Sequence, residues 1–124
     1  MKKYITGDLL HYKICNAKYL IEVTNTSKHG YCFKGVKDDF NGVICDEFIE
    51  DISLTPEILE KNGWSKEQEN YFNDSYHIFL ECKYEKYSAY KVVHNNVVWL
   101  RDVRSVSDLQ HLLFGLGINQ EMEV

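Results

Sequence analysis

The first half of the chain alternates apolar and polar residues over short runs. Between positions 19 and 24, Tyr19, Ile21 and Val23 occupy one side of a predicted strand, and mixed residues occupy the other. This alternation is typical of a half-buried antiparallel sheet. Further strands are predicted at 8–12, 31–35 and 43–45. Because polar turns separate these strands at short intervals, the pattern predicts a small barrel.

The stretch "ISLTPEILEKNGW" has the clearest helix boundaries in the sequence. Thr55 suits the N-cap, and Pro56 suits the first helical position. Gly63 can take a left-handed conformation just past the last turn, so that Trp64 folds back onto the helix. The pattern predicts a short helix that acts as a rigid joint between two groups of strands.

Three apolar segments follow, and they predict an antiparallel meander. The segments are "YHIFLECKY", "AYKVVHN" and "VVWLRDV", with a tight turn expected at Asn95-Asn96. One face of the first strand is predicted to hold Tyr76, Ile78, Leu80 and Cys82, and the other face His77, Phe79, Glu81 and Lys83.

A second helix is predicted from Ser105, whose hydroxyl can cap it, to Gly117. Asp108 stands three positions after the cap, as in a capping box. The expected apolar stripe is Val106, Leu109, Leu113 and Leu116. Residues 119–124 are expected to fray.

These elements predict an α+β fold. Residues 1–53 are expected to form an SH3-like antiparallel barrel, and residues 54–124 a helix, a three-stranded meander and a C-terminal helix. At 124 residues, the chain is too short for two full-sized domains, so both parts are expected to pack as one unit.

The overall charge argues against general attraction to nucleic acid or anionic membranes. The formal net charge is -5 at pH 7, whereas phosphate binding depends on clustered Lys and Arg. No apolar run approaches the length of a membrane span. We therefore expect a cytoplasmic protein with no membrane partner.

The four cysteines, Cys15, Cys32, Cys45 and Cys82, are widely spaced and never form a Cys-x-x-Cys pair. This spacing argues against a disulfide framework and favours buried, reduced thiols. The five histidines and these cysteines could still gather around zinc from distant positions, which spacing alone leaves open. We expect no metal site and no cofactor.

No nucleophile with a base, carboxylate pair or metal constellation stands out in the sequence. His111 lies near the apolar stripe of the second helix, without an evident nucleophile or orienting carboxylate, and is interpreted as a helix-surface or partly buried residue. The sequence thus indicates a protein that is not an enzyme. The alternative function is a nucleic-acid-associated protein that uses the Lys/Tyr hairpin at 83–91, and a small enzyme with a site assembled from scattered residues comes third.

Two segments, "ISLTPEILEKNGW" and "VRSVSDLQHLLFGLG", resemble a family of small uncharacterised proteins from anaerobic gut bacteria, their prophages and other mobile elements. In that family Trp64 is usually Phe, and Ser107-Asp108 is usually His-Gln. The resemblance covers about two thirds of the chain, and the N-terminal half of such proteins looks similar to an SH3-like barrel. It implies no activity, because the matching residues are mostly caps and apolar contacts. We therefore expect an accessory protein of a bacterium or its mobile elements, acting as a protein-binding module.

The region from Asp38 to Glu60 contains many acidic residues and no Lys or Arg. An inert acidic face explains this composition in the simplest way. The alternative is an apolar centre of Phe48, Ile49 and Ile52 within an acidic rim, which would suit a basic protein partner. The predicted partner-binding residues are Asp46, Glu47, Phe48, Glu50 and Asp51.

The segment "KYEKYSAYK" is the best candidate for nucleic-acid binding, because lysines for phosphates alternate with rings for base stacking. The candidate residues are Lys83, Tyr84, Lys86, Tyr87 and Lys91. An ordinary solvated hairpin with tyrosines anchored in the core explains the same pattern, and the acidic composition favours it.

Both arginines precede the second predicted helix, where a positive charge is electrostatically unfavourable. The simpler expectation pairs Arg104 with Asp108, and Arg101 with Asp102 or an acid from another strand. The functional alternative is that they grip a carboxylate or a phosphate.

Overall fold

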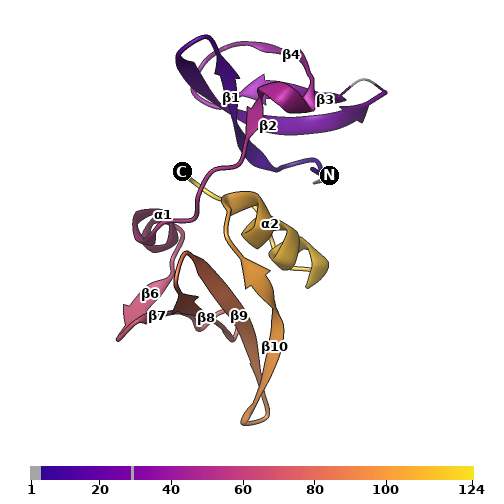
Figure 1. Cartoon of the computed structure of the whole chain (residues 1–124). Coiled ribbons are helices and arrows are strands. Elements are labelled where there is room, and N and C mark those ends of the chain that lie inside the picture. The colour runs from indigo at the N-terminus through magenta and orange to yellow at the C-terminus, as the bar shows by residue number, and fades with distance from the viewer. Residues whose placement is uncertain (1–3, 29) are drawn as a thin grey trace. The chain divides into compact units, whose positions relative to one another are not determined.

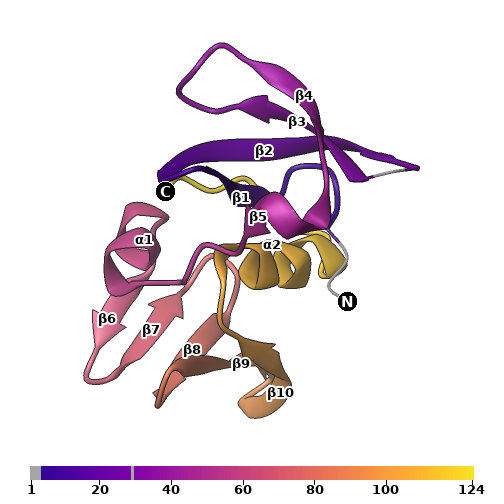
Figure 2. The ribbon, with the colours of Figure 1, turned by 45° about the horizontal axis from the view of Figure 1, so that its top comes forward.

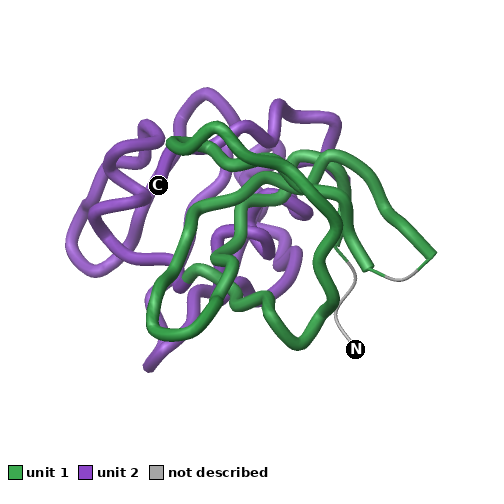
Figure 3. Tube along the Cα trace, turned by 90° about the horizontal axis from the view of Figure 1, so that it is seen from above, with its two compact units in different colours: residues 1–52 green, residues 53–124 purple. Residues whose placement is uncertain are grey.

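The described residues form two five-stranded antiparallel sheets and two α-helices, which confirms the α+β class. The computed structural model describes residues 4–28 and 30–124 (Figure 1). The chain divides into two compact units, residues 1–52 and 53–124 (Figure 3).

Unit 1 contains a sheet with the strand order β4-β3-β2-β1-β5. Its elements are β1 (Leu9–Ile14), β2 (Ala17–Ser27), β3 (Gly30–Gly35), β4 (Asn41–Ile44), the 3-10 helix η1 (Asp46–Phe48) and β5 (Ile49–Glu50). The alternation in β2 places Ile21 and Val23 fully inside the unit, where they pack with Leu10, Phe33 and Ile44. Period-two patterning therefore identifies the buried face of this strand correctly.

The sheet of unit 1 does not close into a barrel. Strands β4 and β5 are its two edges, and β5 pairs only with β1, through His11↔Glu50 and Tyr12↔Ile49. The predicted SH3-like barrel is therefore not confirmed, although all its predicted strands are present. The sequence pattern missed β5, because a strand of two residues is too short to display an alternation.

Unit 2 contains a sheet with the strand order β10-β9-β8-β7-β6. Its elements are α1 (Pro56–Lys61), β6 (Ser65–Glu67), β7 (Asn70–Asn73), β8 (Ile78–Lys83), β9 (Lys86–Val93), β10 (Asn96–Val103) and α2 (Val106–Gly115). Figure 2 shows the strands in this order, with α1 near β6 and α2 near β9 and β10. The predicted three-stranded meander is thus extended by a hairpin of two short strands, β6 and β7.

Both helices begin where the sequence predicts, and α2 ends at Gly115, two residues before the predicted Gly117. The Thr55 hydroxyl accepts a hydrogen bond from the Ile58 N–H at 3.3 Å. In α2, the Ser105 hydroxyl accepts from the Asp108 N–H at 3.1 Å, and the Asp108 carboxylate accepts in return from the Ser105 N–H at 3.3 Å. This reciprocal pair is a capping box, which satisfies two N–H groups that the first turn leaves without helical partners.

One face of the second sheet and one face of α2 are buried. Ile78, Leu80, Ala89 and Val103 from the strands are buried, as are Val106, Leu109, Leu112 and Leu113 from the helix. Two residues predicted for these faces are exposed. Leu116 is at the C-cap of α2, and Cys82 is near the end of β8, where the buried layer ends.

The C-terminal tail is held by hydrogen bonds, so the prediction that it frays is wrong. The Asn62 side chain exchanges two hydrogen bonds with the backbone of Glu123, both at 2.8 Å. The Gln110 amide donates to the Gln120 carbonyl oxygen at 3.1 Å. These side chains come from α2 and the end of α1, so no local pattern in residues 119–124 reveals them.

Neither helix of the described residues has the length and apolar character that crossing a bilayer would require.

Candidate functional site

A cavity of about 730 Å³ lies in unit 1. Four chain segments form its wall: the residues before β1, the end of β2, the start of β3 and the start of η1. The described lining residues are Tyr4, Ile5, Thr26, Ser27, Lys28, Gly30, Tyr31, Cys45, Asp46 and Glu47. The cavity therefore combines aromatic side chains with charged ones.

Tyr4 and Tyr31 form the fixed aromatic part of this cavity. Their rings meet edge to face, with centroids 5.4 Å apart. The Tyr4 N–H donates a hydrogen bond to the Tyr31 hydroxyl oxygen at 3.4 Å, and both residues are buried. Such edge-to-face contacts favour one arrangement of the rings, so this wall is preorganised.

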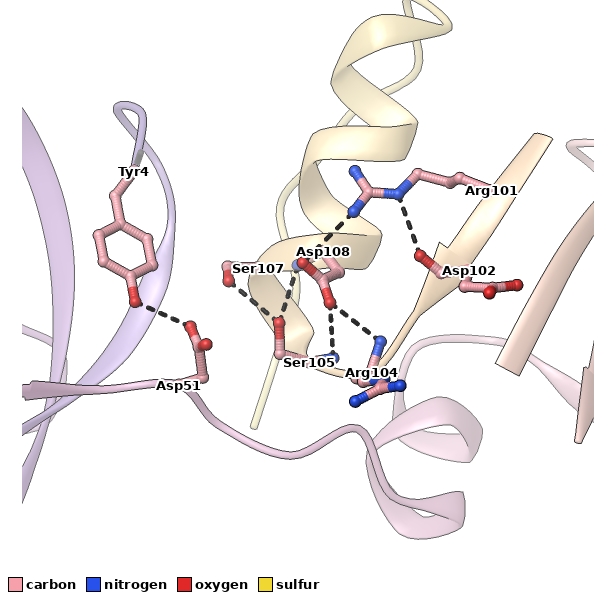
Figure 4. Close-up of polar contacts among 8 residues, drawn as sticks. All are labelled: Tyr4, Asp51, Arg101, Asp102, Arg104, Ser105, Ser107 and Asp108. Atoms are coloured by element: carbon pink, nitrogen blue, oxygen red, sulfur yellow. Dashed lines mark hydrogen bonds and ion pairs between the residues drawn. The ribbon is translucent and has the colours of Figure 1, made fainter. Parts of the chain in front are cut away.

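Asp51 supports the cavity indirectly. The Tyr4 hydroxyl donates a hydrogen bond to the Asp51 carboxylate at 3.0 Å (Figure 4). Burial raises the pKa of Tyr4 well above its ordinary value, and the hydrogen bond to Asp51 and the nearby charges of Asp51 and Asp46 raise it further. Tyr4 therefore stays neutral at physiological pH and serves as a hydrogen-bond donor. Asp51, predicted as a partner contact, instead positions this ring.

Asp46 and Glu47 are the predicted partner-binding residues that line the cavity. Both belong to η1, and both are exposed. Among the described residues, neither carboxylate forms an ion pair. With Lys28 as the remaining charged lining residue, the described wall carries a small net negative charge.

Glu50, another predicted partner-binding residue, forms ion pairs and does not line the cavity. Its carboxylate pairs with Lys13 at 2.9 Å and Lys18 at 3.1 Å. These hydrogen bonds hold the pKa of Glu50 below its ordinary value. Because two lysines surround one glutamate here, this part of the predicted acidic rim is not acidic in three dimensions.

The apolar centre predicted within the acidic segment is not formed. Phe48 is 45% exposed, but Ile52 is buried and Ile49 packs partly against the core of unit 1. A strand places alternate residues on opposite faces, so β5 directs its isoleucine inward. Of the three predicted apolar residues, Phe48 is therefore the exposed one, and it does not line the cavity.

Sequence reasoning missed the tyrosines of the cavity. Tyr4 precedes the first strand, and Tyr31 follows a turn far along the chain, so no spacing rule links them. Gly30, next to Tyr31, packs so closely on the carbonyl oxygen of Ile44 that a Cβ there would collide, but this contact becomes visible only in the structure. Only the paired strands bring these segments to one place.

The lysines of the Lys/Tyr segment make contacts within unit 2. Lys83 pairs with Glu81 at 3.1 Å, and Lys86 pairs with Asp102 at 2.7 Å. The Lys91 amine donates to the Tyr76 carbonyl oxygen at 3.2 Å. Each of the three amines thus has an acceptor within the protein, as an ordinary hairpin would provide.

The two candidate tyrosines of that segment differ in exposure. Tyr87 is buried at 7% exposure, with its ring against Tyr71 at a centroid distance of 6.2 Å. Tyr84 is fully exposed in the β8–β9 turn, where its φ is +55°. One open ring in a tight turn is a small platform compared with the stacked series that single-strand binding proteins use.

The arginine contacts differ from the predicted pairs. The Arg101 guanidinium lies 3.5 Å from the Asp108 carboxylate and also donates to the Asp102 carbonyl oxygen at 3.1 Å. Arg104 contributes its backbone N–H to Asp108, at 3.0 Å (Figure 4). Arg104 also lines a cavity of about 560 Å³. The other lining residues are Tyr84, Glu85 and Lys86.

The cysteines are more exposed than predicted. Cys15, Cys45 and Cys82 are exposed, because they fall at turns and near strand ends, and Cys32 is intermediate, at a position of β3 between the buried Tyr31 and Phe33. Within residues 4–28 and 30–124, no three His, Cys, Asp or Glu side chains come together in a group that could hold a metal ion.

Comparisons with protein-family models, with curated proteins and with solved structures found no match. The resemblance to the family of small proteins from gut anaerobes therefore stays a prediction.

Proposed function

We propose that the protein is a non-enzymatic protein-binding module, and that the cavity of unit 1 accepts a basic side chain of a protein partner. The supporting observation is that Asp46 and Glu47 stand at a cavity whose inner wall is built from Tyr4 and Tyr31. A lysine or arginine has an apolar stem and a charged head. The rings suit the stem, and the two carboxylates suit the head through charge-assisted hydrogen bonds.

The finer fold assignment belongs to this proposal. We infer that unit 1 is an open SH3-like sheet, because four strands follow one another as a meander and a 3-10 turn leads into a last strand that returns to β1. Small domains of this kind recognise peptides in aromatic-lined grooves. Fold does not imply function, so the argument depends on the cavity residues.

The biological setting is likewise proposed. The two helix segments support membership of the family from gut anaerobes and their mobile elements, with the role of an accessory protein. The exposed thiols of Cys15, Cys45 and Cys82 favour a reducing compartment, because free cysteines persist there. We therefore place the protein in the bacterial cytoplasm.

The proposal can be tested by selecting ligands from a library of displayed peptides and measuring the dissociation constant of the best binder. We expect selected peptides to contain Lys or Arg, with binding that weakens as salt rises. The variant Asp46→Asn/Glu47→Gln should bind at least about tenfold more weakly, since two charged contacts are lost.

The matched control is Glu57→Gln/Glu60→Gln, which removes the same charge from two exposed positions of α1 in unit 2. This control should retain the dissociation constant of the unmodified protein. Selection of peptides without basic residues, or equal weakening by both double variants, would contradict the proposed site. Enrichment of single-stranded RNA over every peptide would contradict the protein-binding assignment.

A further inference from the structure

The hairpin formed by β9 and β10 exposes large apolar side chains on both of its faces. The exposed residues are Val92 at 42%, Val93 at 39%, Val97 at 56%, Val98 at 49% and Trp99 at 57%. Adjacent residues of a strand point to opposite faces, so no single element of the unit could bury both Val97 and Val98. Figure 1 shows this hairpin extending beyond the rest of its sheet.

The tip of this hairpin contains only two strands, because β8 is shorter than β9 and β10. Pairing between β8 and β9 ends at Ile78↔Lys91, with one further hydrogen bond from the Val92 N–H to the His77 carbonyl oxygen at 2.9 Å. Beyond that point β9 pairs only with β10, through Val92↔Val97 and Val93↔Asn96. The hairpin turn at His94 and Asn95, both with positive φ, closes this two-stranded extension.

Strand β10 is also an edge of the sheet. Its one partner strand among the described residues is β9, and the next pairing along its outer side is the bridge Ser53↔Ser105, past the end of the strand. Residues 92–100, "VVHNNVVWL", contain no Lys, Arg, Asp, Glu or Pro. Exposed edges usually carry such residues, which prevent pairing with another chain. The irregularity between Trp99 and Arg101 falls in the middle of β10, so the regular part of this edge is residues 96–99.

We propose that β10 pairs antiparallel with β10 of a second copy of this chain, across a twofold axis near Val98, so that the two sheets merge into one. A twofold contact uses the same patch on both copies. Each copy supplies the backbone groups and the apolar side chains that the other lacks. Association would therefore extend each sheet and place apolar side chains of the other copy beside Val97, Val98 and Trp99 on both faces.

Charge and side-chain pairing select the second copy as the occupant. With Val98 opposite its symmetry mate, Val97 of each copy lies opposite Trp99 of the other. Aromatic and β-branched pairs across strands are favourable. Arg101 and Asp102 lie beyond the irregularity in β10, and the facing segment of the other copy ends at its turn of His94 and Asn95, so no like charges meet. A strongly basic partner or a nucleic acid would find no charge on residues 92–100.

Trp99 also continues an existing aromatic row. Across the sheet, Phe72 pairs with Phe79, Phe79 with Tyr90, and Tyr90 with Trp99. The rings of Phe79 and Tyr90 are stacked at 4.9 Å, and those of Phe72 and Phe79 at 5.6 Å. The row thus places Trp99 at the open edge of the sheet, next to Tyr90 in the strand register.

The experiment is sedimentation velocity on the full chain across a dilution series, with circular dichroism to check folding. The unmodified protein should sediment as a dimer that dissociates on dilution. Val98→Lys should raise the dimer dissociation constant at least about tenfold, because it places two ammonium groups beside the twofold axis. Val97→Lys tests the opposite face of the same strand and should have the same effect.

The matched control is Val36→Lys, which introduces the same charge at a valine of similar exposure, 46%, in a loop of unit 1. This variant should dimerise as the unmodified protein does. A monomer at every concentration would overturn the proposal, as would dimers of folded Val98→Lys and Val97→Lys with unchanged dissociation constants. Peptide binding in unit 1 is a separate readout, so either proposal can fail alone.

Discussion

The Trp64 N–H donates a hydrogen bond to the carbonyl oxygen of Leu59, at 3.0 Å. Gly63, directly before Trp64, has a φ of +86°, which turns the chain back over the end of α1. Trp64 is 3% exposed, and its ring meets Tyr76 at a centroid distance of 6.3 Å. The end of a very short helix is therefore fixed by one left-handed residue and by the packing of the next side chain.

Substitution of Gly63 should destabilise the protein through the backbone alone. No atom lies within 4 Å of a Cβ built at this position, so space is not the constraint. Gly63→Val should lower the free energy of unfolding by about 1 to 3 kcal/mol, because a β-branched residue resists a positive φ. Urea denaturation followed by tryptophan fluorescence measures this change.

Gly115→Ala is the control for this experiment. Its Cβ would also meet nothing within 4 Å, but Gly115 is the last residue of α2 and lacks the positive φ. The free energy of unfolding should stay unchanged or rise slightly, since alanine favours the helix. An unchanged value for Gly63→Val would mean that the turn after Asn62 tolerates another conformation.

Asp108 should matter more as a helix cap than as an ion-pair partner. Its carboxylate accepts hydrogen bonds from the backbone N–H groups of Arg104 and Ser105, at 3.0 and 3.3 Å. Its contact with Arg101 is longer, at 3.5 Å. Asp108→Ala should cost about 1 to 2 kcal/mol, as losses of helix caps do. Arg101→Met, which keeps the apolar stem, should cost less than about 1 kcal/mol.

Both variants can be compared by chemical denaturation at neutral pH and moderate salt. Ser75→Ala, at an exposed position between β7 and β8, controls for the loss of a polar side chain outside a cap. Equal costs for Asp108→Ala and Arg101→Met would assign the stabilisation to the ion pair instead of the cap.

The features of the fold that were predictable are those set by neighbours in sequence. Thr55, Gly63 and Ser105 mark helix ends correctly, because caps depend on residues three or four positions apart. The β9–β10 turn was placed one residue late, at Asn95-Asn96, because His94 takes the positive φ that the pattern assigned to asparagine. Element boundaries of this kind depend on register, which is set across strands.

The candidate site was less predictable, because it is assembled from distant segments. Charge alone marked Asp46 and Glu47 but could not separate them from Glu50, which pairs with lysines of β1 and β2. Tyr4 and Tyr31 come from segments that only sheet formation brings together. A run of like charges in sequence therefore need not be a run of like charges on the surface.

Thiol labelling should distinguish the cysteines in the folded protein. Cys15, Cys45 and Cys82 are exposed, and Cys32 is partly covered within β3. With an excess of a chromogenic disulfide reagent, three thiols should react quickly and the Cys32 thiol more slowly, because the reaction requires access to sulfur. The variant Cys32→Ser should remove the slow phase. A single fast phase from all four cysteines would contradict the partial burial of the Cys32 thiol.

Asp102 should make the stability of unit 2 depend on pH in the acidic range. Its carboxylate accepts a hydrogen bond from the Lys86 amine at 2.7 Å and another from the Ser88 hydroxyl at 2.8 Å. The Lys86 contact is the main cause that holds the pKa of Asp102 below its ordinary value of 3.8, and Ser88 adds to it. Asp102 therefore binds a proton more readily in the unfolded chain than in the folded one. Its stabilising contribution is present above the unfolded pKa and is lost as pH falls through the folded pKa.

The measurement is the free energy of unfolding of the unmodified protein and of Asp102→Asn, at a series of pH values from neutral down to about pH 2. The unmodified protein should be the more stable at neutral pH. The difference should shrink below about pH 4, because protonated Asp102 no longer attracts the Lys86 amine. Glu85→Gln, which removes an equal charge from an exposed position in the β8–β9 turn, is the control for general charge effects. A difference that stays constant with pH, or one that Glu85→Gln reproduces, would show that the Lys86–Asp102 contact does not stabilise the folded state.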